Sequence, residues 1–167
     1  MSAAHKLVVM GVSGCGKSTL GQALAHALGY ALIEGDEHHL PASKAKMRAG
    51  IPLVDADREP WLDRLGSLVA AEPGGAVLTC SALKRSYRER LRARVPDLRF
   101  VFIEIDPAQA RERVAARSGH MFPPSLVANQ FATLESPVAE DGVIAVPAHG
   151  ALAGQVAAVE AWLGSGS

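Results

Sequence analysis

The sequence predicts a three-layer α/β fold in which a five-stranded parallel sheet is flanked by helices. Short β-like runs alternate with helical patterns along the 167 residues, and several runs, such as Ala76–Leu78 and Val101–Ile103, are apolar throughout. Strands that are apolar on both faces are typical of a parallel sheet covered on both sides. Regular alternation of strands and helices indicates a doubly wound arrangement.

The expected elements follow one another without an evident linker. We expect strands near residues 6–10, 30–34, 75–80, 98–105 and 142–146, and helices near 17–28, 60–71, 84–94, 107–117, 123–134 and 150–163. Gly29 is suited to end the first helix, and Pro107 to begin another. No repeat or low-complexity tract interrupts the pattern, so we expect one domain over residues 1–167, with a disordered tail at 164–167.

Composition excludes several classes of protein. Hydrophobic residues make up 49% and charged residues 20%, which is typical of a soluble globular chain. Lys plus Arg and Asp plus Glu both number 17, which gives no indication of a nucleic-acid partner. The two cysteines, Cys15 and Cys80, lack metal-ligand spacing and suggest a reducing compartment. With no signal peptide and no apolar run long enough to span a membrane, we expect a cytoplasmic protein without a membrane partner.

The most informative segment is a phosphate-binding loop near the start of the chain. Its residues fit the pattern G-x-x-x-x-G-K-[ST] in full: Gly11, Val12, Ser13, Gly14, Cys15, Gly16, Lys17 and Ser18. An apolar run precedes the loop and a helix-like stretch follows it, which is the strand–loop–helix setting that the motif requires. A glycine-rich loop that merely turns the chain is the alternative. The context favours the P-loop NTPase fold.

Each residue type in this loop has a physical role. The glycines let successive backbone N–H groups curl around a phosphate, and the helix that follows adds its partial positive charge. Lys17 is expected to reach the outer phosphates, and the Ser18 hydroxyl to ligate magnesium. We therefore expect ATP and Mg²⁺ as cofactors, with Thr19 completing the nucleotide-binding segment.

Acidic residues follow the second expected strand, where open parallel sheets bind ligands. Asp36 is a candidate to accept a proton from a substrate hydroxyl, and Glu34 to hold magnesium directly or through water. A solvated turn is the alternative. The third strand ends in Thr79, Cys80 and Ser81 rather than in the Asp that many phosphate-loop enzymes use. The acidic partner of the metal must then come from elsewhere, and Glu34 or Asp36 is the nearest candidate.

Further cations are candidates for gripping an anionic substrate. Gly50 and Pro52 predict a loop before the helix at 60–71, and Arg58 in this segment either clamps a carboxylate or pairs with Asp55 or Asp57. Asp57 is also placed to cap the following helix.

A second group of cations surrounds the next two helices. Ser81 is placed to cap the helix at 84–94, on which Lys84 and Arg88 share one face near the expected site. Arg113 and Arg117 end another helix, and a segment rich in Gly and Pro follows. We expect a mobile lid at about 118–136 that excludes water, with these arginines stabilising charge on the transferred phosphate. Cations at a helix C-terminus are the alternative.

The motifs together resemble gluconokinases of the shikimate-kinase-like type. They occur in the order GVSGCGKSTLG, EGDEHH, KMRAGIPLVDADREPWL, CSALKRSYRERLR and GHMFPPSLVANQFATLE, and they span roughly residues 6 to 146. The resemblance implies transfer of the ATP γ-phosphoryl group to the 6-hydroxyl of D-gluconate, and it implies a homodimer. A kinase of another small acceptor and a regulatory nucleotide-binding module are the alternatives.

The resemblance also assigns roles to individual residues. It implies that Gly11 to Ser18 bind ATP and magnesium, that Asp36 is the base, that Arg58, Lys84 and Arg88 hold gluconate, and that Arg117 belongs to the lid. Taking the resemblance together with the residue patterns, we expect Lys17, Asp36 and Arg117 to be catalytic, Ser18 and Glu34 to hold the metal, and Asp36, His39, Arg58, Ser81, Lys84 and Arg88 to contact the acceptor. Two positions depart from the family pattern. Leu40 follows His39, so that Pro41 comes one place late, and Ser43 stands where an Asn is expected.

Overall fold

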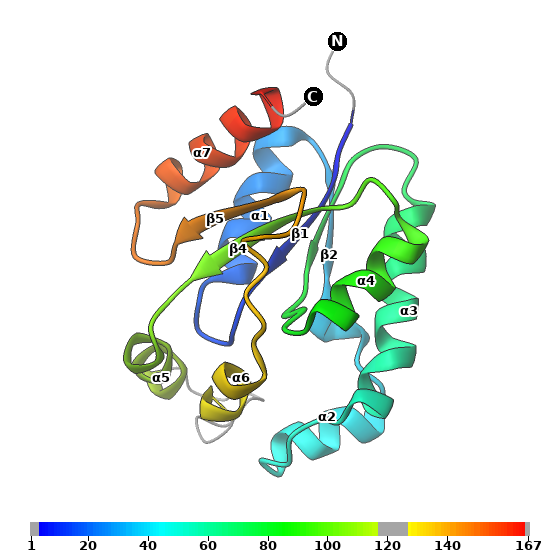
Figure 1. Cartoon of the computed structure of the whole chain (residues 1–167), viewed down its shortest axis with the longest axis vertical. Helices are drawn as coiled ribbons and strands as arrows, with labels where there is room; N and C mark the ends of the chain where they lie inside the picture. Colours follow the sequence, from blue (N-terminus) through cyan, green and yellow to red (C-terminus); the bar gives the residue numbers. More distant parts are fainter. Residues whose placement is uncertain (1–3, 117–126, 166–167) are drawn as a thin grey trace.

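A five-stranded parallel sheet forms the centre of the molecule in the computed structural model, which describes residues 4–116 and 127–165 (Figure 1). The strands are β1 (Lys6–Met10), β2 (Ala31–Glu34), β3 (Ala76–Thr79), β4 (Arg99–Glu104) and β5 (Val143–Pro147). Their order across the sheet is β2-β3-β1-β4-β5, and each neighbouring pair is parallel. The predicted fold class and all five predicted strands are confirmed.

Helices follow the strands in alternation. In the described part of the chain they are α1 (Lys17–Leu28), the 3₁₀ turn η1 (Gly35–His38), α2 (Pro41–Arg48), α3 (Asp55–Ala71), α4 (Arg85–Arg94), α5 (Pro107–Ala116), α6 (Val127–Thr133) and α7 (Leu152–Ser165). Among these, none combines the length and the apolar character needed to cross a bilayer.

Two hydrophobic clusters show how the helices cover the sheet. On one face, Leu7, Val9 and Val101 of the sheet pack with residues of α1 and α7. On the other face, Val8 and Phe100 pack with residues of α3 and α4. Neighbouring residues of β1 therefore point into opposite clusters, as expected for a strand buried on both faces. Figure 1 shows α3 and α4 to the right of the sheet and α1 and α7 to its upper left.

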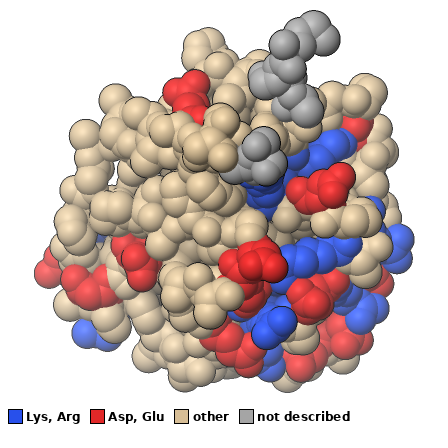
Figure 2. All heavy atoms as spheres, turned by 45° about the horizontal axis from the view of Figure 1, so that its top comes forward, with Lys and Arg blue, Asp and Glu red and all other residues tan. Residues whose placement is uncertain are grey.

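Charged side chains of both signs alternate on the side formed by α3 and α4. Figure 2 shows blue and red residues interspersed there, while much of the opposite side of this view is uncharged. Arg90 pairs with Asp63 at 2.7 Å, and Arg94 lies 3.8 Å from the same carboxylate. These contacts join α3 to α4 across the surface.

The helices differ from those predicted in three places. Helix α2 was not among the predicted helices, and α3 begins at Asp55 rather than near residue 60, so Pro60 lies inside the helix. Asp57 does not precede the helix as predicted; it is the third helical residue, and its carboxylate accepts the N–H of the N-cap residue Val54 at 2.9 Å. Helix α7 extends to Ser165, so the prediction of a disordered tail is wrong for residues 164 and 165.

Part of the predicted lid lies outside the described residues. Positions 118–126 and Arg117 belong to the segment that the structure does not describe. The remainder of the predicted lid, residues 127–136, contains α6 and the chain that follows it. In Figure 1, α5 and α6 lie together at the lower left, beyond the end of β4.

Candidate nucleotide and acceptor site

The phosphate-binding loop joins β1 to α1, as the motif predicts. Gly11, Gly14 and Gly16 have positive φ angles of 146°, 85° and 98°, which L side chains rarely adopt. A Cβ atom on Gly14 would also lie 2.8 Å from the carbonyl oxygen of Ala110. The motif fixes Gly11 and Gly16 and leaves the position of Gly14 open, and the backbone conformation explains why glycine stands at all three.

The polar groups of this loop are held by contacts from several elements. Lys17 Nζ donates to the carbonyl oxygens of Gly11 and Val12 at 3.0 and 3.1 Å. The Gly11 N–H donates to the Ser81 carbonyl at 3.3 Å, and Arg113 donates to the Gly14 carbonyl at 3.1 Å. The loop is therefore braced from both the β3–α4 connection and α5.

Cys15, although part of the loop, is buried. Burial raises the pKa of its thiol above the ordinary value. A thiol that is protonated and enclosed is not a nucleophile, so Cys15 has a packing role.

A candidate magnesium site lies between the loop and the end of β2. Ser18 Oγ donates to Glu34 Oε2 at 2.8 Å, and Thr79 Oγ1 donates to the same oxygen at 3.2 Å. Glu34 Oε1 is buried and has no hydrogen-bond partner among the described residues. Hydroxyl and carboxylate oxygens are the ligands that Mg²⁺ prefers, and Mg²⁺ usually takes only one or two carboxylates from a protein. The residues present therefore fit this metal.

Asp36 follows Glu34 after a single glycine. A Cβ atom on Gly35 would lie 2.2 Å from the Thr79 carbonyl oxygen, so only glycine fits between the two acidic residues. The Gly35 N–H donates to Thr79 Oγ1 at 3.3 Å, and Trp61 Nε1 donates to the Gly35 carbonyl at 2.8 Å. Both backbone polar groups of Gly35 are thus held by neighbouring elements, which fixes the turn η1.

His39 orients the Asp36 carboxylate. Its Nε2 lies 3.5 Å from Asp36 Oδ1, and its ring stacks on Trp61 with centroids 4.0 Å apart. Desolvation by the surrounding atoms would raise the pKa of Asp36. The hydrogen bond from His39 and the positive charges of Lys17 and Arg58 outweigh that effect, so the pKa lies below its ordinary value. The Asp36 side chain is nevertheless 69% exposed, so water or a substrate hydroxyl has access to it.

Arg58 is buried, and no carboxylate of the described residues pairs with it. Its Nε has no hydrogen-bond partner among the described residues, and its guanidinium lies 5.5 Å from the centre of the Tyr87 ring. The predicted alternative, a pair with Asp55 or Asp57, is not what the structure shows. Asp55 accepts from Lys84 and Tyr87 at 3.0 and 2.6 Å, whereas Asp57 accepts from Lys46 at 2.9 Å.

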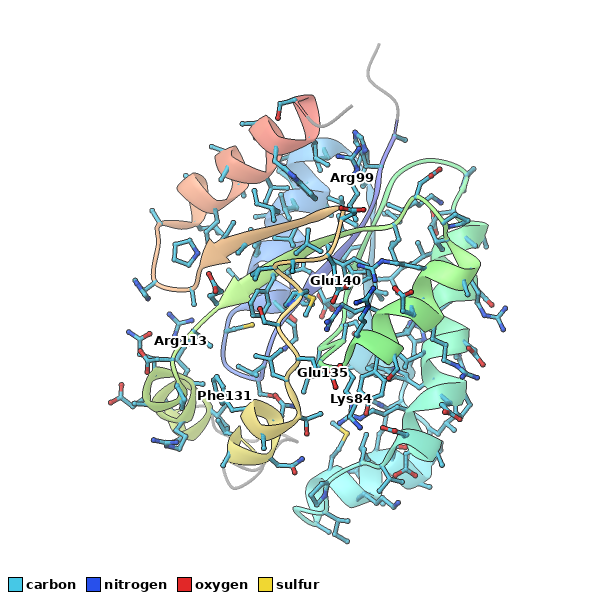
Figure 3. The ribbon with its side chains drawn as sticks, in the orientation of Figure 1. Lys84, Arg99, Arg113, Phe131, Glu135 and Glu140 are labelled. Atoms are coloured by element: carbon cyan, nitrogen blue, oxygen red, sulfur yellow. The ribbon has the colours of Figure 1, made fainter. Side chains whose placement is uncertain are left out.

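Lys84 precedes the first turn of α4 and is one-third exposed. Its pair with Asp55 spans from α4 to the start of α3. Both side chains are partly exposed, so the ion pair is weak and open to exchange with a ligand. Figure 3 shows Lys84 at the lower end of α4, near α2 and α3.

Arg88 is engaged by the protein itself. Its side chain is fully buried, and all three guanidinium nitrogens donate: to Glu140 at 2.6 to 3.2 Å, to the Ala82 carbonyl at 2.8 Å and to the Glu135 carbonyl at 2.9 Å. This placement argues against the predicted contact with the acceptor. Arg88 instead ties α4 to the segment after α6, where Figure 3 shows Glu135 and Glu140.

Ser81 does not cap α4, contrary to prediction. The residue before the helix is Lys84, and the Glu135 carboxylate accepts the Arg85 N–H at 2.8 Å in place of a local cap. The carbonyl of Ser81 instead accepts the Gly11 N–H of the phosphate loop. The next residue, Ala82, has a positive φ of 46°. The connection between β3 and α4 is thus hydrogen-bonded to the phosphate-binding loop.

The two departures from the family pattern both fall at the start of α2. Pro41 is the first residue of this helix, a position whose backbone N–H has no partner within the helix, so the missing N–H of proline costs no hydrogen bond. Ser43 lies in the same helix and is buried.

Four residues that the motifs did not single out take part in the site. Thr79 and Trp61 hold the turn after β2, Glu140 neutralises Arg88, and Gln130 of α6 accepts a hydrogen bond from the phosphate loop. Thr79 carried a signal in the sequence because it ends a predicted strand on the ligand-binding edge, and Trp61 and Gln130 lie within the motifs of the resemblance, whereas Glu140 carried none.

Comparison with known proteins identifies the family of the chain. Residues 7–137 match the family described as AAA domain. The gluconokinase of Gluconobacter oxydans is 51% identical over 84% of this chain and 80% of its own length. The thermoresistant gluconokinase of Escherichia coli is 39% identical over 82% of this chain and 80% of its own.

Solved structures are similar along nearly the whole chain. The crystal structure of a gluconokinase from Sinorhizobium meliloti superposes with a TM-score of 0.89 and 45% identity, covering 98% of this chain and 94% of that one. Shikimate kinase from Aquifex aeolicus, with a TM-score of 0.64 and 16% identity over 96% and 97% of the two chains, shares the fold. On the identity and coverage of these relatives, the chain belongs to the gluconokinase family.

Proposed function

We propose that this protein is an ATP-dependent carbohydrate kinase that transfers the γ-phosphoryl group of ATP to the 6-hydroxyl of D-gluconate, giving 6-phospho-D-gluconate and ADP. One observation carries the proposal: Glu34 and Asp36 lie one residue apart beside the phosphate loop, on a turn held by Thr79 and Trp61. Relatives at up to 51% identity carry the name gluconokinase, which supports this choice of reaction.

The phosphate loop and Lys17 would hold the outer phosphates of ATP. Among the described residues, Lys17 donates to two backbone carbonyls of its own loop, and these bonds are easily exchanged for charge-assisted bonds to phosphate. Ser18 and Glu34 would hold Mg²⁺, which when bound neutralises phosphate charge during the transfer. In this reaction type, the contribution of the protein is mostly positioning and charge stabilisation.

Asp36 would receive the proton of the attacking hydroxyl. Its lowered pKa keeps the carboxylate ionised at neutral pH, so it accepts a hydrogen bond from the hydroxyl and orients it. His39 holds this carboxylate in place, and the Trp61 ring holds His39. A rigid acceptor of this kind favours attack along a single direction.

Arg58 and Lys84 would hold the carboxylate end of the acceptor. A buried guanidinium without a paired acceptor is costly, and a bidentate carboxylate satisfies it. Lys84 can leave Asp55 for the same ligand because both partners are partly exposed. Arg117 would serve as a further cation near the transferred phosphate.

A coupled assay of ADP release tests the proposal. The acceptors are gluconate, shikimate, AMP and none, each with Mg²⁺ and ATP, and oxidation by 6-phosphogluconate dehydrogenase identifies the product. We expect turnover that depends on gluconate. Turnover with another acceptor would retain the kinase and reject the substrate, and ADP release that ignores every acceptor would reject both.

An Asp36→Asn variant tests the mechanism. We expect kcat to fall by roughly a hundredfold or more, the range found for loss of a general base, with ATP affinity nearly unchanged. Asp97→Asn is the matched control, because Asp97 is exposed and lies outside the site. Near-normal turnover of Asp36→Asn would remove Asp36 from its assigned role.

We further propose Mg²⁺ as the metal, the cytoplasm as the compartment and one domain over residues 1–167, as the sequence suggests, and a homodimer as the assembly, as the family resemblance suggests. Light scattering coupled to size exclusion measures the assembly directly, and a mass corresponding to one chain would reject the homodimer.

A further inference from the structure

Gln130 lies on α6, far along the chain from the phosphate loop, yet it contacts the loop directly. Its side-chain oxygen accepts the backbone N–H of Ser13 at 2.6 Å, across 117 positions of sequence. The residue is buried, with 5% of its surface exposed. Because the Ser13 N–H is a donor, the oxygen end of the carboxamide must face the loop.

The Ser13 N–H is one of the amides that a phosphate-binding loop offers to its ligand. In nucleotide-free loops such an amide needs another acceptor, since an unpaired buried N–H is costly. A neutral carboxamide oxygen satisfies the amide only moderately, whereas a phosphate oxygen forms a charge-assisted bond that is about twice as strong. Exchange of one acceptor for the other is therefore favourable when ATP arrives.

The surroundings of α6 leave it room to adjust when the contact is exchanged. A cavity of about 210 Å³ lies between α6 and the sheet, and it is lined by Phe131 and Leu134 on one side and by Phe102 and Ile103 on the other. Val12 of the phosphate loop borders the same cavity. This pocket is open to solvent, so α6 is not packed against the sheet on that side. Figure 3 shows Phe131 on α6 near the end of β4.

We propose that Gln130 is a placeholder for a phosphate oxygen of ATP. In the nucleotide-free protein its carboxamide holds the Ser13 peptide in the orientation that binds phosphate, and the phosphate of ATP displaces it. Gln130 thus keeps the loop organised before the ligand arrives, at some cost in ATP affinity. The inference rests on ATP binding in the proposed function, but it does not depend on which acceptor is phosphorylated.

Two substitutions at this position have opposite effects on ATP affinity. Gln130→Glu keeps the acceptor, strengthens its bond to the Ser13 N–H and adds a charge that repels phosphate. We expect the Kd for ATP to rise roughly tenfold. Gln130→Met leaves the Ser13 N–H without an acceptor until phosphate binds. We expect a lower Tm for the nucleotide-free protein and an ATP Kd about fivefold lower, the factor for one neutral hydrogen bond.

The measurement is calorimetric titration with a non-hydrolysable ATP analogue and Mg²⁺, in the absence of any acceptor. Asn129→Asp is the matched control, since it makes the same change of charge one residue away on a side chain that is not buried. Shifts of both Gln130 variants in the same direction, or shifts within twofold of the control, would overturn the placeholder role.

A second measurement covers the case in which Gln130→Met does not fold. In the wild-type protein, the amide proton signal of Ser13 should move when the analogue is added, because its acceptor changes from a carboxamide to a phosphate. An unmoved Ser13 signal at saturation would refute the exchange. Both measurements are independent of gluconate, so a failure of the proposed acceptor leaves them interpretable.

Discussion

Replacing Glu140 with alanine is expected to lower the free energy of unfolding by about 3–5 kcal/mol, because it leaves the buried charge of Arg88 unpaired. The Arg88 side chain is 0% exposed and that of Glu140 is 8% exposed. The Glu140 carboxylate accepts from Arg88 at 2.6 Å and from Arg92 at 2.9 Å, so its removal leaves Arg88 without its counter-charge. For a chain of this size, such a loss corresponds to a Tm lower by about 10 °C.

Thermal and urea unfolding followed by circular dichroism measures this loss. Glu89→Ala is the matched control, because Glu89 also pairs with Arg92 but its side chain is 55% exposed. We expect the control to change stability by less than about 1 kcal/mol. If the two variants differ by less than about 1 kcal/mol, the reasoning about burial is refuted. The double variant Arg88→Met/Glu140→Leu should recover most of the loss, since no unpaired charge remains.

Three further outcomes are expected. Desolvation opposes ionisation of Glu140, but hydrogen bonds from Arg88 and Arg92 hold its pKa below the ordinary value. The ionised Glu140 carboxylate therefore stabilises the fold at pH values above the ordinary pKa of Glu, and this stabilisation is lost as the pH falls through the lower pKa of the folded protein. Between about pH 5 and 3, the Tm of the wild type should fall more steeply than that of Glu140→Gln. Equal slopes would contradict this. Glu34→Gln should raise the Mg²⁺ concentration for half-maximal turnover roughly tenfold, as for other losses at a metal site, without changing ATP binding in EDTA; an unchanged Mg²⁺ requirement would remove Glu34 from the metal. Gly21→Ala should destabilise by about 1–3 kcal/mol, because the added Cβ would lie 2.6 Å from Thr79 Cγ2. Gly154→Ala, where nothing lies within 4 Å, is its control in unfolding measurements, and equal effects of the two would refute the clash.

The strands could be predicted from sequence because each buried strand is a short, continuous run of apolar residues. Val77 and Leu78 are both fully buried, one in each hydrophobic cluster, which is what a continuous apolar run indicates. Helix α2 carries no comparable signal, since its residues are mostly polar and Gly50 and Pro52 follow closely. The start of α3 was misplaced because proline favours the first helical position, whereas Pro60 lies within the helix.

The site was predictable where its residues are contiguous. The phosphate loop needs eight successive positions, and the turn from Glu34 to Asp36 needs three. Spacing placed Lys84 and Arg88 together but carried no information on what covers them, and Glu140, which pairs with Arg88, is 52 positions away. The contact of Gln130 with Ser13 likewise depends on tertiary packing alone.

The hydrogen bonds of the Gly35 backbone separate the groups that set the reaction geometry from the groups that choose the acceptor. Thr79 of β3 holds its N–H and Trp61 of α3 holds its carbonyl, so Glu34 and Asp36 move as one rigid body. The metal and the attacking hydroxyl would then keep a fixed mutual distance, whatever the rest of the acceptor looks like. Arg58 and Ser43, by contrast, lie on helices appended to that turn. We expect acceptor choice to drift through α2 and α3 while the reaction geometry is inherited unchanged.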